Sequence, residues 1–214
     1  MRKIYFNRLT VFILGVFVIV LSGCASSSPS RFYQLSSVSG QTTMAQDVSS
    51  QGSEVVVIGP LHIPDYLDRP QIVTRTGQNE LKLSEFDRWA GAIENDIALT
   101  LAEDVSAKLP QDRFFVVHWT PLIEKQLPTS YKVALFITRF DGTLGGSVTL
   151  LAQWSIFGKE NKFLLKKEST ITEKASGNGY DELVETMSKA VDRLSVAIAN
   201  SIASFPKGTG QIGQ

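Results

Sequence analysis

The chain has 214 residues, of which 43% are hydrophobic, and it balances 21 Lys+Arg against 21 Asp+Glu. A neutral chain lacks the basic excess of proteins that bind nucleic acids, so we expect no nucleic acid partner. The apolar content suffices for a sizeable core, and the length suits one domain of ordinary size with a tether.

The first 24 residues have the features of an export signal. Basic residues come first, an apolar run follows from residue 11, and the run ends in Leu21-Ser22-Gly23-Cys24. It is too short to span a membrane, which takes ~20 apolar residues. The ending resembles the lipobox of bacterial lipoproteins, which implies cleavage after Gly23, diacylglycerol on Cys24 and acylation of the new amino terminus. An ordinary signal peptide with an incidental cysteine is the alternative.

Lipidation also explains the cysteine content. Cys24 is the only cysteine, so no intramolecular disulfide can form. Removing residues 1–23 takes away three basic residues and no acidic ones, which leaves 18 against 21 and a net charge of −3. In lipoproteins generally, aspartate after the lipidated cysteine favours retention in the inner membrane. Ala25 at this position therefore predicts a lipid anchor in the outer membrane, with the domain facing the periplasm.

The stretch after the cysteine predicts a tether. Residues 25–29 (ASSSP) have nothing to pack and predict a flexible leash, and residues 31–35 (RFYQL) predict a short strand. Residues 36–53 are rich in Ser, Gln, Thr and Gly and predict a mobile linker. These compositions divide the chain into a signal peptide, a lipidated tether, one domain and a disordered tail, with bounds 1–23, 24–53, 54–206 and 207–214.

Short strands are predicted for the first part of the domain. The β-branched run at residues 55–58 fits a strand buried on both faces that ends at Gly59-Pro60. Residues 61–63 continue in an extended conformation. Residues 71–76 and 80–83 fit the two strands of a hairpin.

Between them, the loop of residues 64–70 is framed by two prolines, which restrict its backbone. A stiff loop loses little entropy when another protein docks on it, and tyrosine often anchors interfaces. We therefore treat Tyr66, Leu67 and Arg69 as candidate partner-binding residues. The alternative is that Tyr66 and Leu67 fold inward and close the end of the sheet.

A long amphipathic helix is predicted next. Ser84, three residues before Asp87, offers an N-terminal capping box, and Pro110 ends the helix. Apolar residues follow at steps of three and four: Phe86, Trp89, Ile93, Ile97, Leu101, Val105 and Leu109. The predicted outer face carries Glu94, Asp96, Glu103 and Asp104. Trp89 is predicted to pack in the core at the helix start, with a partner-binding role as the alternative.

The rest of the domain predicts four strands and a second long helix. The strands are residues 113–118, 131–141, 147–157 and 162–173, with a loop between Pro121 and Pro128. The helix opens at Asn178, ends before Pro206 and has an apolar stripe. Each amphipathic helix covers one stripe of a sheet. The fold class is therefore α+β, a layered α/β sandwich in which two long helices pack on one mixed, largely antiparallel sheet.

Several runs carry a family resemblance. Residues 63–75 are IPDYLDRPQIVTR, residues 79–81 are NEL and residues 87–90 are DRWA. A Tyr-x-Leu pattern lies at residues 33–35, and residues 194–199 (LSVAIA) fit as well. These runs resemble the ABC-type transport auxiliary lipoproteins, of the paraquat-inducible C or YmbA-like type. The resemblance spans nearly the whole mature chain, and the PDYLDRPQIV run is its most specific part.

The resemblance implies an accessory lipoprotein that is not an enzyme. Members of this family lie in the outer membrane, face the periplasm and partner an inner-membrane-anchored MCE-domain protein. With permease and ATPase components, that protein moves lipids between membranes. One departure concerns residues 91–93, which are Gly-Ala-Ile where the family often has Glu-Pro-Leu. This departure leaves the geometry of the helix start open.

An enzyme and a different binding role remain as alternatives. The two histidines, His62 and His118, each stand alone in sequence, and there is neither a Gly-x-Ser-x-Gly elbow nor a phosphate-binding Gly-Lys-Ser/Thr loop. We therefore predict no catalytic residue, metal site or cofactor. A lipoprotein that activates a cell-wall enzyme or tethers an envelope complex would have the same sequence features. The sequence leaves the transported substrate open, and also whether the chain forms a homo-oligomer.

Overall fold

The computed structural model describes residues 29–39 and 54–207. The predicted signal peptide and Cys24 lie outside the described residues, as do residues 40–53 of the predicted linker and residues 208–214. Lipidation of Cys24 therefore stays a prediction.

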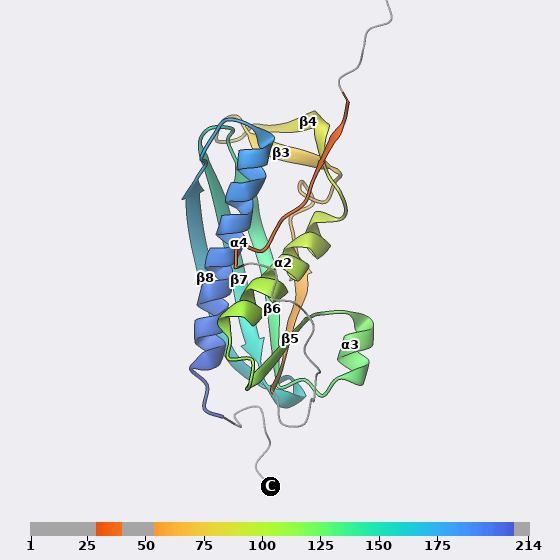
Figure 1. The fold of residues 1–214 in the computed structure, drawn as a ribbon, viewed down its shortest axis with the longest axis vertical. Coiled ribbons are helices and arrows are strands. Elements are labelled where there is room, and N and C mark those ends of the chain that lie inside the picture. Colours follow the sequence, from red (N-terminus) through yellow and green to blue (C-terminus); the bar gives the residue numbers. More distant parts are fainter. Residues whose placement is uncertain (1–28, 40–53, 208–214) are drawn as a thin grey trace, which may run out of the picture.

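Most of the predicted strands and helices are present (Figure 1). In chain order, the described elements are β1 (Arg31–Tyr33), β2 (Glu54–His62), β3 (Gln71–Arg75), β4 (Leu81–Trp89), α2 (Ile93–Lys108), β5 (Phe114–His118), α3 (Pro121–Gln126), β6 (Tyr131–Gly142), β7 (Ser147–Phe157), the short 3-10 helix η1 (Lys159–Asn161), β8 (Phe163–Lys174) and α4 (Tyr180–Ala203).

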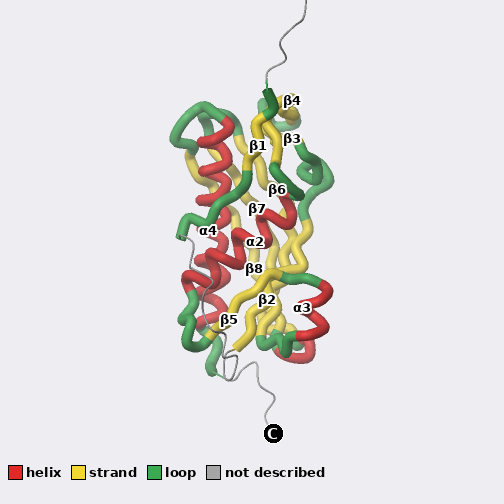
Figure 2. The backbone as a smooth tube through the Cα atoms, turned by 45° about the vertical axis from the view of Figure 1, so that its right-hand side comes forward, coloured by secondary structure: helices red, strands yellow, loops and turns green. Residues whose placement is uncertain are grey.

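The described strands form one eight-stranded mixed sheet around β6 (Figure 2). On one edge, β6 pairs antiparallel with β7, and β7 pairs antiparallel with β8. On its other edge, β6 pairs in parallel with β2 and, at Gly142, with β3. β5 pairs in parallel with β2, β3 and β4 form an antiparallel hairpin, and β1 lies parallel to β4.

The helices α2 and α4 lie side by side on one face of this sheet (Figure 1). α4 contacts β7 and β8, whereas α2 contacts β2 and β5. The apolar stripe of α4 is buried, as its spacing predicts: Leu183, Met187, Val191, Leu194, Ile198 and Ile202. The predicted α+β sandwich is confirmed.

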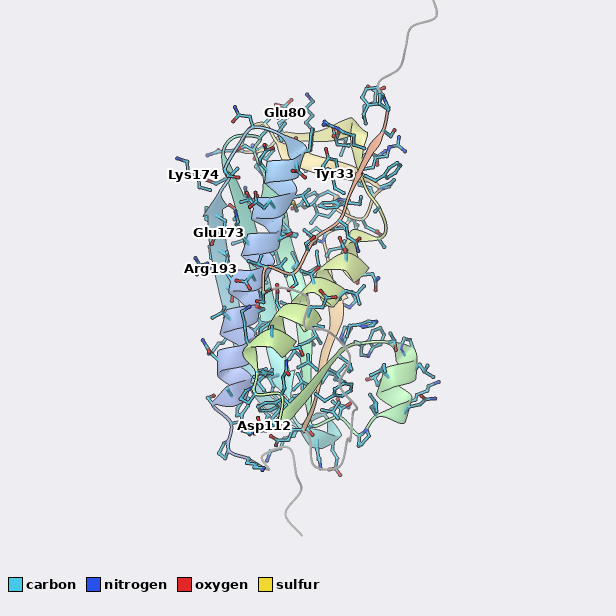
Figure 3. All side chains as sticks on the ribbon, in the orientation of Figure 1. Tyr33, Glu80, Asp112, Glu173, Lys174 and Arg193 are labelled. Carbon is cyan, nitrogen blue, oxygen red and sulfur yellow. The ribbon has the colours of Figure 1, made fainter. Side chains whose placement is uncertain are left out.

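The core lies between the sheet and the two helices. Side chains alternate along β7, and its inward side chains are all buried: Val148, Leu150, Ala152, Trp154 and Ile156. The indole of Trp154 donates to the Ser169 hydroxyl on β8 at 3.0 Å, which satisfies its one polar group. At the surface, Arg193 of α4 donates to Glu173 of β8 at 3.2 Å (Figure 3).

The predicted start of the first long helix is wrong. The chain stays extended through Trp89 as β4, and α2 begins at Ile93. Ser84 and Asp87 do form two hydrogen bonds of 2.9 Å, one between the side chains and one from the Asp87 N–H. They lie inside β4, however, where the register against β3 shifts. The Ser84–Asp87 pattern therefore predicts a local bond between side chain and backbone. Such a bond forms in an irregular strand as readily as at the start of a helix.

Two further details differ from the predictions. The predicted loop between Pro121 and Pro128 contains α3, where the Thr120 hydroxyl accepts the Ile123 N–H at 3.1 Å and caps the helix. The predicted strand end at Gly59-Pro60 is instead an irregularity within β2. Gly59 has φ of +117°, and a Cβ there would lie 2.6 Å from the Trp119 Cβ, so only glycine fits.

Candidate interaction surfaces

Residues 30–39, which we call the N-terminal segment, run along the helices between the predicted lipid anchor and the domain (Figure 1). On β1, the Arg31 guanidinium and the Tyr33 hydroxyl both donate to Asp87 Oδ1, at 3.0 and 2.9 Å. The Leu35 N–H donates to Asp96 Oδ2 on α2 at 2.8 Å, and Leu35 is buried in the core.

The second half of the N-terminal segment continues this pattern. Ser37 donates to Asp104 Oδ1 at 2.6 Å, and Ser39 donates to Asp192 Oδ1 of α4 at 3.2 Å. Alternate residues from Arg31 to Ser39 therefore contact a row of aspartates, which we call the aspartate row: Asp87, Asp96, Asp104 and Asp192. Residues 36–39, predicted as the start of a mobile linker, are thus docked on the domain.

The sequence prediction placed Asp96 and Asp104 on the outer face of the helix, which is wrong. Both are buried, and Asp104 is 0% exposed, because the N-terminal segment covers them. Burial raises the pKa of Asp96 more than the hydrogen bonds from Leu35 and Gln34 lower it. Burial likewise raises the pKa of Asp104, against the opposing effects of Ser37 and Lys108.

A groove of about 510 Å³ lies beside the N-terminal segment, between that segment and the first turns of α4. Its lining mixes polar residues, among them Ser36, Ser37, Asp181 and Lys189, with the apolar side chains of Phe32, Val38 and Val184. Lys189 donates to Glu185 at 2.7 Å, so these two charges compensate each other. The groove is therefore an open feature of the surface, whereas small-molecule sites are enclosed and predominantly apolar.

The loop of residues 64–70 folds against β3 and β6. Leu67 is only 3% exposed and belongs to the hydrophobic core. Tyr66 is half-buried, and its hydroxyl donates to Asp141 Oδ2 at 2.9 Å and accepts the Phe140 N–H at 3.4 Å. Tyr66 and Leu67 thus point inward, which agrees with the alternative in which this loop closes the end of the sheet.

Asp141 is the charged centre of this region and is 0% exposed. Two nitrogens of Arg75 donate to its two oxygens, each at 2.9 Å, and Arg139 donates to Oδ1 at 3.0 Å. Burial raises the pKa of Asp141, but the hydrogen bonds from Arg75, Tyr66 and Arg139 outweigh it and lower the pKa overall. Burial and the hydrogen bond to the negatively charged Asp141 raise the pKa of Tyr66 to about 12, against the opposing effect of Arg75.

The candidate partner residues are thus divided between core and surface. Leu67 and Trp89 are buried, whereas Arg69 is partly exposed. The accessible rim of the loop includes Asp65 and Asp68, which are both exposed. Sequence reasoning missed the role of Asp141, although Arg75, Arg139 and Asp141 lie in predicted strands, where charged residues on a core-facing position signal a buried ion pair.

Large apolar side chains are exposed at several places on the domain. The most exposed on regular elements are Phe32 at 64%, Leu122 at 60%, Phe163 at 59%, Phe136 at 52% and Leu83 at 45%. Phe32 and Leu83 lie on β1 and β4, near the N-terminal segment, whereas Leu122 lies on α3 at the opposite end (Figure 1).

The described residues offer no metal centre. His62 of β2 lies opposite Phe136 of β6, and His118 of β5 lies opposite Ile58 of β2. Within residues 29–39 and 54–207, no group of three His, Cys, Asp or Glu side chains is placed to hold a metal ion. None of the described helices is long and apolar enough to cross a membrane.

Comparison with protein families gives one match over most of the chain. The family described as "ABC-type transport auxiliary lipoprotein component" matches residues 33–199. Two similar proteins are both called intermembrane transport lipoprotein PqiC, from Escherichia coli (strain K12) and Shigella flexneri. Each is 26% identical over 187 residues, which cover 87% of this chain and 94% of the relative.

Two crystal structures share the fold. One, of an uncharacterized protein, has a TM-score of 0.65 and 19% identity and covers 82% of this chain and 99% of its own. The other is protein XCC0632 from Xanthomonas campestris, with a TM-score of 0.61, 13% identity and coverage of 81% and 94%. At these identities the likeness concerns the fold alone.

Proposed function

The chain belongs to the family of ABC-type transport auxiliary lipoprotein components, and we propose that it acts as a non-enzymatic outer-membrane subunit of an intermembrane transport system. In this proposal the domain faces the periplasm and binds an MCE-domain protein that is anchored in the inner membrane. The observation that carries the proposal is the similarity to PqiC, an intermembrane transport lipoprotein, over 87% of this chain and 94% of that protein.

The contacts of the buried carboxylates support a binding role over catalysis. Asp141 is engaged by two arginines and a tyrosine, and Asp87 by Arg31, Tyr33 and Ser84. These groups fix a loop and a terminal segment on the sheet. A general acid or base has to be within reach of a substrate proton, and such reach requires an open site around the carboxylate.

The 64–70 loop is the surface that we propose for the partner. Leu67 in the core and the Tyr66 hydroxyl on Asp141 hold the loop from below, so its rim is pre-organised. The rim presents Asp65 and Asp68 to solvent, with Arg69 partly accessible between the loop and β4. An acidic rim favours a partner surface that carries basic residues, because complementary charges increase the association rate.

Crosslinking in intact envelopes tests this proposal. The full-length protein is crosslinked, purified and analysed by mass spectrometry, and we expect an MCE-domain protein among its crosslinks. Single Asp65→Lys and Asp68→Lys variants should each lose most of this partner while keeping their thermal stability. Asp112→Lys is the matched control, because Asp112 is exposed and lies at the opposite end of the domain (Figure 3).

Three results would contradict the proposal in different ways. Crosslinks only to cell-wall enzymes would support the alternative function of enzyme activation or tethering. If the Asp65→Lys and Asp68→Lys variants crosslink to the MCE-domain partner as well as the Asp112→Lys control does, the partner binds elsewhere than on the loop. An unmodified Cys24 in the mature protein would remove the lipid anchor.

A further inference from the structure

The domain is attached to its predicted anchor at one end of its long axis. β1 begins at Arg31, beside the hairpin of β3 and β4, and Tyr33 and Glu80 lie in the same half of the molecule, far from Asp112 (Figures 1 and 3). Arg31 lies seven positions after Cys24, which limits this connection to at most ~25 Å of fully extended chain. The 24 residues of α4 span ~36 Å, so the end that carries α3 is much farther from the anchor.

This attachment point is firmly fixed to the domain. Arg31 and Tyr33 both bond to Asp87, and the Ala90 N–H donates to the Tyr33 carbonyl at 2.8 Å. β1 also pairs with β4 over all three of its residues. An anchor on Cys24 would therefore hold the β1–β4 end close to the membrane surface, and the end that carries α3 would lie farther from it.

Two exposed apolar side chains share one face at this attached end. Phe32 lies opposite Arg88, Arg88 lies opposite Gln71, and Val73 lies opposite Leu83. Residues directly opposite each other, and residues two apart on one strand, point to the same face of a sheet. Phe32 and Leu83 therefore project from the same face, and they are 64% and 45% exposed.

Charged residues of both signs surround this pair. Arg31 flanks Phe32 and keeps a side-chain exposure of 67% although it is paired with Asp87. Lys82 is exposed next to Leu83, and the acidic residues Glu80 and Glu85 are exposed nearby on the same hairpin. Because these charges nearly balance, an attraction to anionic lipid is weak here, and the apolar side chains have to supply most of a membrane contact.

We propose that the β1–β4 end of the domain rests on the lipid bilayer that holds the anchor, with Phe32 and Leu83 in the headgroup region. The inference rests on the lipidation of Cys24 in the proposed function and goes beyond it by fixing the orientation of the domain. Aromatic and aliphatic side chains commonly occupy the membrane interface. A tether also raises the local concentration of the surface next to it, so a contact of two side chains suffices to orient the domain.

Site-specific labelling of the lipidated protein tests this orientation. Because the thiol of Cys24 is consumed by lipid, a cysteine introduced elsewhere is the only free thiol. Phe32→Cys, Leu83→Cys and Leu122→Cys each replace an exposed apolar residue and are labelled with an environment-sensitive fluorophore. The three proteins are reconstituted in phosphatidylethanolamine–phosphatidylglycerol vesicles, with or without lipids that carry a quenching nitroxide near the headgroup.

We expect severalfold stronger quenching by the nitroxide lipid at positions 32 and 83 than at position 122. Equal quenching at all three positions, on vesicles that carry the protein, would overturn the orientation while leaving the lipid anchor intact. Labels at 32 and 83 that are shielded from water but not quenched would show that protein covers this face, which would also overturn it. A protein that fails to float with the vesicles would contradict the lipid anchor and, with it, this inference.

Discussion

Two regions of this domain use aspartates to hold a segment in place, one on the sheet and one on α2, but they do so with opposite electrostatics. In the 64–70 loop, one fully buried carboxylate, Asp141, is compensated by Arg75 and Arg139, and its pKa is lowered. In the N-terminal segment, Asp96 and Asp104 accept hydrogen bonds from neutral groups, and burial raises their pKa values. The first arrangement stabilises a charged carboxylate, whereas the second raises the pH at which the carboxyl loses its proton.

This difference predicts how firmly each region is held. Removing the loop's carboxylate leaves two cations beside a buried neutral group, which is costly. Neutralising Asp96 or Asp104 removes a charge that burial disfavours, and this change costs little.

Asp141→Asn should have the largest effect. The neutral amide cannot accept from both arginines and from Tyr66, so we expect a loss of about 3 to 4 kcal/mol in the free energy of unfolding. Arg75 and Arg139 are partly exposed, with side-chain exposures of 19% and 35%, and water will compensate part of the loss. Denaturant unfolding measures the change, and Asp68→Asn, in the exposed rim of the loop, is the control. Equal stability of the two variants would show that the buried ion pairs do not hold the loop.

Leu67→Ala should follow. The side chain is 3% exposed in the core, and large-to-small changes at such sites cost about 2 to 3 kcal/mol when neighbours can relax. Leu122→Ala on α3 is the matched control. Leu122 is 60% exposed, so this variant should leave the free energy of unfolding unchanged. A stable Leu67→Ala protein that loses its partner would instead place Leu67 at an interface.

The sequence predicted one of these regions better than the other. The loop was recognisable because prolines frame it and Tyr66 and Leu67 offered two defined alternatives, which the structure distinguishes. The aspartate row was not recognisable, because its contacts join residues far apart in sequence: Leu35 and Asp96 are separated by 61 positions and Ser37 and Asp104 by 67. Charged residues on an amphipathic helix predict a solvated face, and only the docked segment reverses that expectation.

The same reasoning explains the error at the start of α2. Apolar spacing through Phe86 and Trp89 fits a helix, but β4 pairs with β3 on one side and with β1 on the other. Tertiary pairing therefore overrides a local helical pattern. The long hairpin of β6 and β7 and the helix α4 were predictable because period-2 and helical spacing persist there over 11 to 24 residues.

Tyr66→Phe should have a moderate effect. It removes the hydrogen bond to Asp141 and the longer one from the Phe140 N–H but leaves both arginines in place, so we expect a loss of about 1 kcal/mol near neutral pH. The pKa of Tyr66 is about 12 against an ordinary 10.0. In alkali the unfolded chain ionises first, so the folded state loses stability as the pH rises from 10.0 to about 12. Tyr66→Phe should therefore lose less stability than the parent over this pH range, as measured by urea unfolding. If both proteins lose the same stability in alkali, the pKa of Tyr66 is not raised by burial and Asp141.

Asp104→Asn should have the smallest effect, and its sign is the sharpest test of the comparison. The folded state holds the proton of Asp104 at a pH where the unfolded carboxyl has released it, because the folded pKa is raised above 3.8. The contribution of this group to stability therefore increases as the pH falls through the folded pKa, and it is fully present below the unfolded value.

An asparagine at position 104 keeps an oxygen that can accept from Ser37 and carries no charge at any pH. We expect Asp104→Asn to match or slightly exceed the parent in stability at neutral pH, by less than about 1 kcal/mol. Its stability should also vary less between neutral and mildly acidic pH. Asp141→Asn should show no such gain, because the lowered pKa of Asp141 makes its charge stabilising throughout that range. Unfolding in urea at a series of pH values measures both profiles. A clear loss of stability in Asp104→Asn at neutral pH would show that the charge of Asp104 is compensated as fully as that of Asp141.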